Sequence, residues 1–115
     1  MLEKLILGVE IGGTKLQLSA GNLAGDILKT HRGRVDRDAG GKGIRQWLLE
    51  HVPQFISAVE AKPYGHVEAI GCGFGGPFDS RSGRVMESIQ ISGWENFPLR
   101  DWFTEHFDRP TLVVN

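Results

Sequence analysis

Six residues near the start of the chain combine side chains that suit phosphate binding. Residues 10–15 read Glu-Ile-Gly-Gly-Thr-Lys and join an apolar segment, Leu5 to Ile11, to an alternating one, Leu16 to Ala20. Two glycines in a tight hairpin let backbone N–H groups approach an anion, and a hydroxyl and an ammonium add further donors. The hairpin therefore predicts a site for nucleotide phosphates. The predicted phosphate-binding residues are Gly12, Gly13, Thr14 and Lys15.

Glu10 opens the same hairpin and has two interpretations. Its carboxylate could hold a Mg²⁺ ion through bound water, or it could simply pair with Lys15. Lys15 itself could be an ordinary solvated lysine, because exposed lysines are the rule. A Gly-Gly hairpin without any ligand also fits the pattern, since such turns are common.

Two other phosphate motifs are excluded by the order of these residues. A Walker loop requires Gly-Lys-Ser/Thr followed by a helix, whereas here Thr14 precedes Lys15 and the next residues alternate like a strand. A dinucleotide-binding fingerprint requires three glycines that open a helix, and that helix is missing as well.

A second glycine pair follows a predicted strand at residues 68–74. The loop reads Gly75-Gly76-Pro77-Phe78-Asp79, and open α/β sheets usually bind ligands beyond the carboxyl ends of their strands. We expect Asp79 to cap the turn, because Asp is a routine turn residue. Asn115 ends the last predicted strand, and its side-chain amide can both donate and accept hydrogen bonds, although a terminal residue can fray. The predicted binding residues for a small polar substrate are Gly75, Gly76, Pro77 and Asn115.

These motifs need an α/β scaffold to position them. The first strand is nearly all apolar, as in a strand that is buried on both faces. Apolar residues at helical spacing predict one helix that Pro53 kinks or divides, and Pro98 opens a second. The resulting order is βββαβαβ, which predicts a mixed sheet. The predicted strands are 5–11, 16–20, 27–35, 68–74, 84–86, 88–91 and 111–114, and the helices are 44–61 and the segment from Pro98.

Composition limits the class of protein. The chain has 115 residues, 40% of them hydrophobic, which suits a single domain with its own core. A net charge of −1 without a basic run makes nucleic acid and anionic membranes poor partners. No apolar run is long enough to span a membrane and no secretory signal is visible, so we expect a cytoplasmic protein.

Cysteine, histidine and tryptophan do not suggest a metal site. Cys72 is the only cysteine, so we expect a buried apolar residue and no disulfide or cysteine-rich zinc site. The four histidines should not cluster, because no ligand spacing is present. Trp94 should anchor its loop, although it could wall a cleft. The histidines are His31, His51, His66 and His106, and the predicted core aromatics are Trp47, Trp102 and Phe103.

Four motifs in one order resemble the ROK family, which contains sugar kinases and sugar-responsive repressors. They are Glu10 to Lys15, Gly71 to Asp79, Gly93-Trp94 with Pro98-Leu99, and Pro110 to Asn115. The resemblance implies the actin-like ATPase (ribonuclease H-like) fold, here as an α/β half-domain with a five-stranded mixed sheet. It implies that the Gly75 loop faces the sugar, and that ATP and Mg²⁺ are the cofactors.

The resemblance also predicts what lies outside the chain. Glu10 stands where many members have Asp, and the family's general base is an Asp that would follow Asn115. We therefore expect no catalytic residue among residues 1–115, which would be the N-terminal small domain of a two-domain sugar kinase. The second domain would hold the adenosine pocket and a structural Zn²⁺ site. On this basis the chain alone is expected to be inactive and to self-associate as a homo-oligomer.

An ATP-dependent, glucokinase-like hexose kinase is the function that the resemblance favours. The alternative is a sugar-sensing transcriptional repressor of the same family. Those members carry a winged helix-turn-helix before the first hairpin, for which we find no room before Leu5. An actin-like structural or chaperone ATPase is a third class, which the Gly-Gly-Pro loop and Gly93-Trp94 fit less well.

Overall fold

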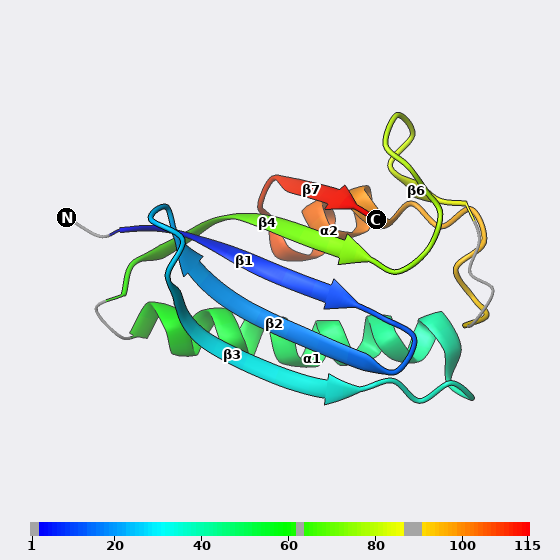
Figure 1. Ribbon diagram of the computed structural model, residues 1–115, viewed down its shortest axis with the longest axis horizontal. Coiled ribbons are helices and arrows are strands. Elements are labelled where there is room, and N and C mark those ends of the chain that lie inside the picture. Colours follow the sequence, from blue (N-terminus) through cyan, green and yellow to red (C-terminus); the bar gives the residue numbers. More distant parts are fainter. Residues whose placement is uncertain (1–2, 62–63, 87–90) are drawn as a thin grey trace.

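The computed structural model describes residues 3–61, 64–86 and 91–115 (Figure 1). The strands and helices follow the predicted order, with one addition, the short strand β5, which pairs with β6. The elements are β1 (Lys4–Ile11), β2 (Lys15–Asn22), β3 (Ile27–Arg34), α1 (Gly40–Ala61), β4 (His66–Phe74), β5 (Phe78–Asp79), β6 (Arg84–Val85), α2 (Leu99–Phe107) and β7 (Thr111–Val114).

The main sheet has five strands in the order β3-β2-β1-β4-β7. The first three strands form an antiparallel meander, and β4 and β7 add to β1 in parallel. This confirms the predicted mixed sheet. The polar residues of 27–35 also predict an edge strand, and β3 does lie at the edge. The predicted strand at 84–86 is β6, which pairs with β5 in a region predicted as loop. Most of the predicted strand at 88–91 lies outside the described residues.

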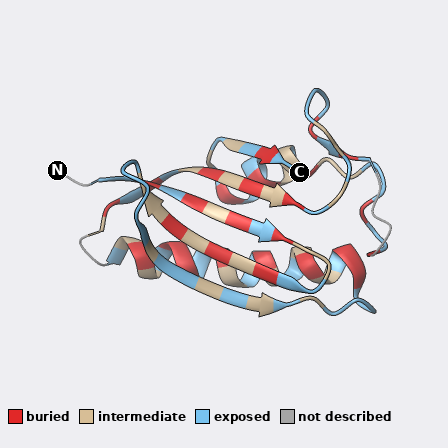
Figure 2. Cartoon of the chain, in the orientation of Figure 1, coloured by how far each residue is buried: buried red, intermediate tan, exposed pale blue. Residues whose placement is uncertain are grey.

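The core lies on one face of the sheet, and both helices cover that face (Figure 1). Burial therefore alternates along β1, with Leu5, Leu7, Val9 and Ile11 buried (Figure 2). The prediction that this strand is buried on both faces was wrong, because Ile6 on its other face is 41% exposed. The apolar residues of 111–114 likewise predict a buried last strand, and this was wrong in part, since only Val113 of β7 is buried.

The two helices pack their apolar stripes as their spacing predicts. In α1 the buried side chains include Ile44, Leu48, Val52, Phe55, Ile56 and Val59. Helix α1 begins at Gly40, earlier than predicted. Pro53 lies inside one continuous helix and does not divide it. Helix α2 follows Pro98 and ends at Phe107. The next residue, Asp108, caps it with a left-handed backbone and donates its N–H to the Thr104 carbonyl.

The helices of the described ranges do not meet the requirements for a membrane span. None of them is both long enough and apolar enough to cross a bilayer.

Candidate functional site

The predicted ligand-binding segments meet at one edge of the sheet. Strands β1, β4 and β7 run parallel, so their carboxyl ends lie side by side, as the three arrowheads in Figure 1 show. The register pairs Ile11 with Phe74 and Gly73 with Val114. The hairpin after β1, the loop after β4 and the residue after β7 are therefore neighbours. A hydrogen bond of 2.9 Å from the Gly75 N–H to the Ile11 carbonyl joins the first two segments.

The hairpin after β1 leaves part of its polar groups available. The Gly12 N–H donates to the Lys15 carbonyl at 3.1 Å and closes the turn, so it is not free for a ligand. Within the described part of the chain, the N–H groups of Gly13 and Thr14 have no hydrogen-bond partner. The side chains of Thr14 and Lys15 are exposed. Two backbone donors, a hydroxyl and an ammonium remain for an anion, which is most of the predicted set.

The tip of the hairpin is held from the side by the segment after β3. The Val35 N–H donates to the Thr14 carbonyl at 2.9 Å, and the Arg37 guanidinium reaches the Gly13 carbonyl at 3.4 Å. Both bonds use carbonyl oxygens, so they orient the turn without consuming its N–H donors. The hairpin is thereby positioned before any ligand arrives.

Glu10 lies on the uncovered face of β1, and its carboxylate extends over Gly73 of β4. A Cβ atom at position 73 would lie 2.7 Å from Glu10 Oε2, so the glycine provides the space for this side chain. Among the described residues Glu10 and Lys15 form no ion pair, so the alternative that Glu10 simply pairs with Lys15 was wrong. Nor does this part of the chain group three or more His, Cys, Asp or Glu residues for a metal ion. Glu10 fits Mg²⁺ only as a single carboxylate, with water as the other ligands.

Cys72 precedes Gly73 on the buried face of β4, as expected for an apolar role. Burial raises the pKa of its thiol, and the charge of Glu10 raises it further. The thiol is therefore protonated at neutral pH and is no nucleophile.

The loop after β4 uses its N–H groups internally. The Gly75 N–H is bound to Ile11, and the Gly76 N–H donates to the Phe74 carbonyl at 3.0 Å. The Pro77 carbonyl accepts from the Met86 N–H at 2.9 Å, which ties the loop to the segment after β6. Because these N–H groups are used within the protein, Gly75 and Gly76 can offer a polar ligand only their carbonyl oxygens. Asn115 is exposed at the same edge.

Two neighbouring residues of this loop region behave as predicted. Asp79 caps the following turn, accepting from the Ser82 hydroxyl at 2.7 Å and from the Arg81 N–H at 3.2 Å. The hydrogen bond from Ser82 is the main reason that the pKa of Asp79 is lowered. Trp94 is only 1% exposed and packs edge-on against Phe74, as expected for an anchor, and it also lines a small pocket with Gly13 and Gly75, as the alternative predicted.

A basic groove beside the hairpin was not predicted. Lys15, Arg32 and Arg34 line a cavity of about 390 Å³ together with Gln17. Lys15 of β2 lies opposite Arg34 of β3 in the strand register. Arg32 donates a hydrogen bond of 2.9 Å to the Gln17 side chain. The sequence signal was the alternation of Arg32 and Arg34, which puts both side chains on one face of a strand. This groove adds positive charge beside the hairpin.

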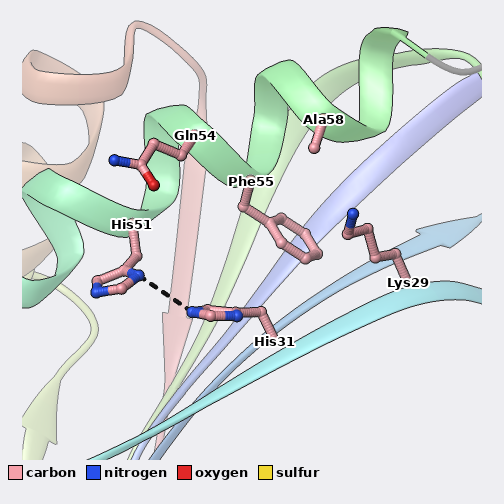
Figure 3. Close-up of a pocket in the computed structure, with 6 residues that line it drawn as sticks. All are labelled: Lys29, His31, His51, Gln54, Phe55 and Ala58. Atoms are coloured by element: carbon pink, nitrogen blue, oxygen red, sulfur yellow. Dashed lines mark hydrogen bonds between the residues drawn. The ribbon is translucent and has the colours of Figure 1, made fainter.

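The prediction that the histidines do not cluster was wrong for two of them. His31 of β3 and His51 of α1 lie 3.1 Å apart between Nε2 and Nδ1 (Figure 3). They meet because α1 packs behind the meander, which brings residues distant in sequence together. Trp47 stacks on His51 with ring centroids 4.4 Å apart and is only half-buried, unlike the predicted core residue.

The other histidines and aromatic residues lie elsewhere. His66 pairs with Glu60 at 2.8 Å, and His106 bonds to the Trp102 carbonyl. Phe103 is fully buried as predicted, whereas Trp102 is half-buried.

Comparison with known proteins gives a consistent result. Residues 6–115 match the model of the ROK family. The glucokinase of Halalkalibacterium halodurans is 26% identical over the whole chain, which corresponds to 34% of that protein. The chain spans about a third of the length of the curated relatives that it matches.

Solved structures share the fold of the chain. A ROK family glucokinase from Streptomyces griseus, in complex with glucose and AMPPNP, is 31% identical with a TM-score of 0.72, over 96% of this chain and 33% of that one. A ROK family transcriptional regulator, a homologue of the E. coli MLC protein, has a TM-score of 0.82 at 20% identity, over 99% of this chain and 28% of that one. The fold is that of the actin-like sugar kinases of the family, as predicted.

Proposed function

The chain belongs to the ROK family, and from this premise we propose that it is the N-terminal domain of an ATP-dependent hexose kinase. The observation that carries the proposal is the junction of the two glycine loops. The Gly75 N–H binds the Ile11 carbonyl, so a phosphate site and a sugar site would be held side by side. Phosphoryl transfer depends mainly on positioning and charge neutralisation, which such a junction favours.

The hairpin residues are proposed to bind the phosphates of ATP. The free N–H groups of Gly13 and Thr14, the Thr14 hydroxyl and the Lys15 ammonium form the donor set. Glu10 would hold Mg²⁺ through water, and the ion would neutralise charge on the phosphates. ATP supplies the phosphoryl group when it is bound.

The sugar would lie against the second loop. Gly75 and Gly76 would accept from its hydroxyls through their carbonyl oxygens, Pro77 would keep the loop stiff, and Asn115 would both donate and accept. The glucokinases among the similar proteins support glucose as the first sugar to test. A reaction that uses ATP in this way would take place in the cytoplasm.

The experiment measures glucose-dependent formation of ADP. It compares residues 1–115 with the same chain extended by the coding sequence that follows codon 115 in its source. We propose that the extended protein is active and that residues 1–115 alone are not, because the general base and the adenosine pocket would lie in the extension. Lys15→Met should lower kcat/KM by about tenfold or more, since a charge-assisted hydrogen bond contributes about 1.5–3 kcal/mol.

Lys42→Met is the matched control, because Lys42 is an exposed lysine on α1 that is not part of the proposed donor set. Equal activity of the Lys15→Met and Lys42→Met proteins would refute the assignment of the hairpin. Activity of residues 1–115 alone would refute the proposal that the general base and the adenosine pocket lie in the extension.

A sugar-sensing repressor is the second candidate, which the similarity to the ROK transcriptional regulator supports at the level of the fold. It predicts saturable sugar binding without formation of ADP. In that case Lys15→Met would leave sugar affinity unchanged, and the substitution would separate the two candidates.

A further inference from the structure

A cavity of about 170 Å³ lies between β3 and α1, away from the edge that carries the glycine loops. Figure 3 shows the Lys29 side chain and the histidine pair on either side of Phe55. The cavity has polar donors at its ends and an apolar wall between them. Its lining residues are Lys29, His31, His51, Gln54, Phe55 and Ala58.

The histidine pair is held in a fixed geometry. One ring donates to the other over 3.1 Å, and the planes of the two rings are 26° apart. Trp47 stacks on His51 from the same helix. Gly33 makes this possible, because a Cβ atom there would lie 2.5 Å from the Trp47 ring. The rings are therefore positioned by packing and are not simply surface side chains.

The pair can accept one further proton without losing its hydrogen bond. The proton between the two facing nitrogens stays, and the added one goes to an outward-facing ring nitrogen. A second proton would place hydrogen on both facing nitrogens and break the contact. The indole ring of Trp47 stacks on His51 with ring centroids 4.4 Å apart, and Glu50 Oε2 lies 4.0 Å from His51 Nε2.

The charges around the cavity favour an anion over a cation. No carboxylate is among the lining residues, and within the described ranges Lys29 of β3 has no acidic partner. Glu50 of α1 is the charged group beside His51, and its side chain is 69% exposed. Two ring nitrogens beside an ammonium would bind a metal ion poorly, because no acidic ligand balances its charge.

We propose that this cavity binds a small organic anion that carries a carboxylate or phosphate group. The anionic oxygens bind Lys29 and the singly protonated histidine pair, and the apolar part of the ligand contacts Phe55 and Ala58. Binding takes up a proton, so affinity falls as pH rises. The proposal does not rest on the kinase function, because it uses neither glycine loop.

The test is calorimetric titration of residues 1–115 with butyrate and with glycerol 3-phosphate, at pH 6 and pH 8. Each titration is made in two buffers of different ionisation enthalpy, which measures proton uptake. We expect saturable binding of at least one probe, proton uptake on binding and lower affinity at pH 8. Binding of butyrate alone assigns carboxylates, and binding of glycerol 3-phosphate alone assigns phosphomonoesters.

Two substitutions connect the binding to the proposed residues. Lys29→Met should weaken binding about tenfold or more, and His51→Gln should remove the pH dependence. Lys42→Met and His106→Gln are matched controls on exposed faces of α1 and α2 and should have no effect. No saturable binding, binding without proton uptake, an unchanged Lys29→Met protein, or tighter binding of Zn²⁺ than of either anion would overturn the proposal.

Discussion

Replacing Gly33 with alanine should destabilise the chain through a single contact. An alanine Cβ at position 33 would lie 2.5–2.7 Å from three atoms of the Trp47 indole. Carbon atoms in contact prefer about 3.5–4.0 Å, so the ring would have to move by about 1 Å. Trp47 stacks on His51, so this movement also disturbs the histidine pair.

The magnitude follows from two opposing terms. Overpacking of this kind typically costs about 1–3 kcal/mol. Replacing glycine by alanine on an extended backbone returns about 0.4–1 kcal/mol, because the unfolded chain loses conformational freedom. The two ranges leave a net loss of at most about 2.6 kcal/mol, with about 1.3 kcal/mol at their midpoints. For a chain of this length the midpoint value should lower Tm by about 5 °C.

Gly71→Ala is the matched control for this measurement. Gly71 also lies in a strand, and a Cβ atom there would meet no atom within 4 Å. It should be neutral or slightly stabilising, while Trp47→Leu should rescue part of the loss in the Gly33→Ala protein. The measurement is the Tm of each variant, from thermal unfolding monitored by circular dichroism. Equal Tm values for the two alanine variants would refute the reasoning.

Three further outcomes are expected. Cys72 should resist Ellman's reagent at pH 8 in the folded chain and react fully in denaturant, since burial and a nearby carboxylate raise its pKa; rapid labelling of the folded chain would contradict this. Asp79 has a lowered pKa, so its turn is stabilised above the unfolded value of about 3.9 and loses that stabilisation as pH falls through the folded pKa. Carboxyl NMR titration should show this lowered pKa and its return towards the ordinary value in Ser82→Ala, and an unchanged pKa in that variant would be evidence against the hydrogen bond. Residues 1–115 should self-associate through the uncovered sheet face, giving a mass above 12.7 kDa in light scattering that Ile6→Thr reduces; a monomer at high concentration would oppose this.

The fold was predictable because local patterns agreed with one another. Alternating residues, helical stripes and the proline before α2 each indicated one element, and the parallel crossover then fixed the strand neighbours. The uncovered face was not predictable from β1 itself. The residue types of Ile6 and Gly8 suggested that both faces of the strand are buried. The burial of a strand face, however, depends on which helices pack over it.

The candidate site was predictable in its location but not in its donors. Two glycine pairs after neighbouring strands had to meet at one edge. Which N–H groups stay free depends on backbone bonds within each loop, so Gly12 and Gly76 could not be distinguished from Gly13 by residue type. The contact of His31 with His51 depends on how α1 lies across β3, which no sequence spacing encodes.

The bond from Gly75 to Ile11 extends the β1–β4 ladder one rung beyond the strands. Its consequence is mechanical. The two loops share a backbone link, so they cannot open apart without breaking it, and a ligand that tightens one loop should reduce the motion of the other. Amide hydrogen exchange at Gly75 would then slow when a ligand occupies only the hairpin, which makes this single amide a reporter for both halves of the site.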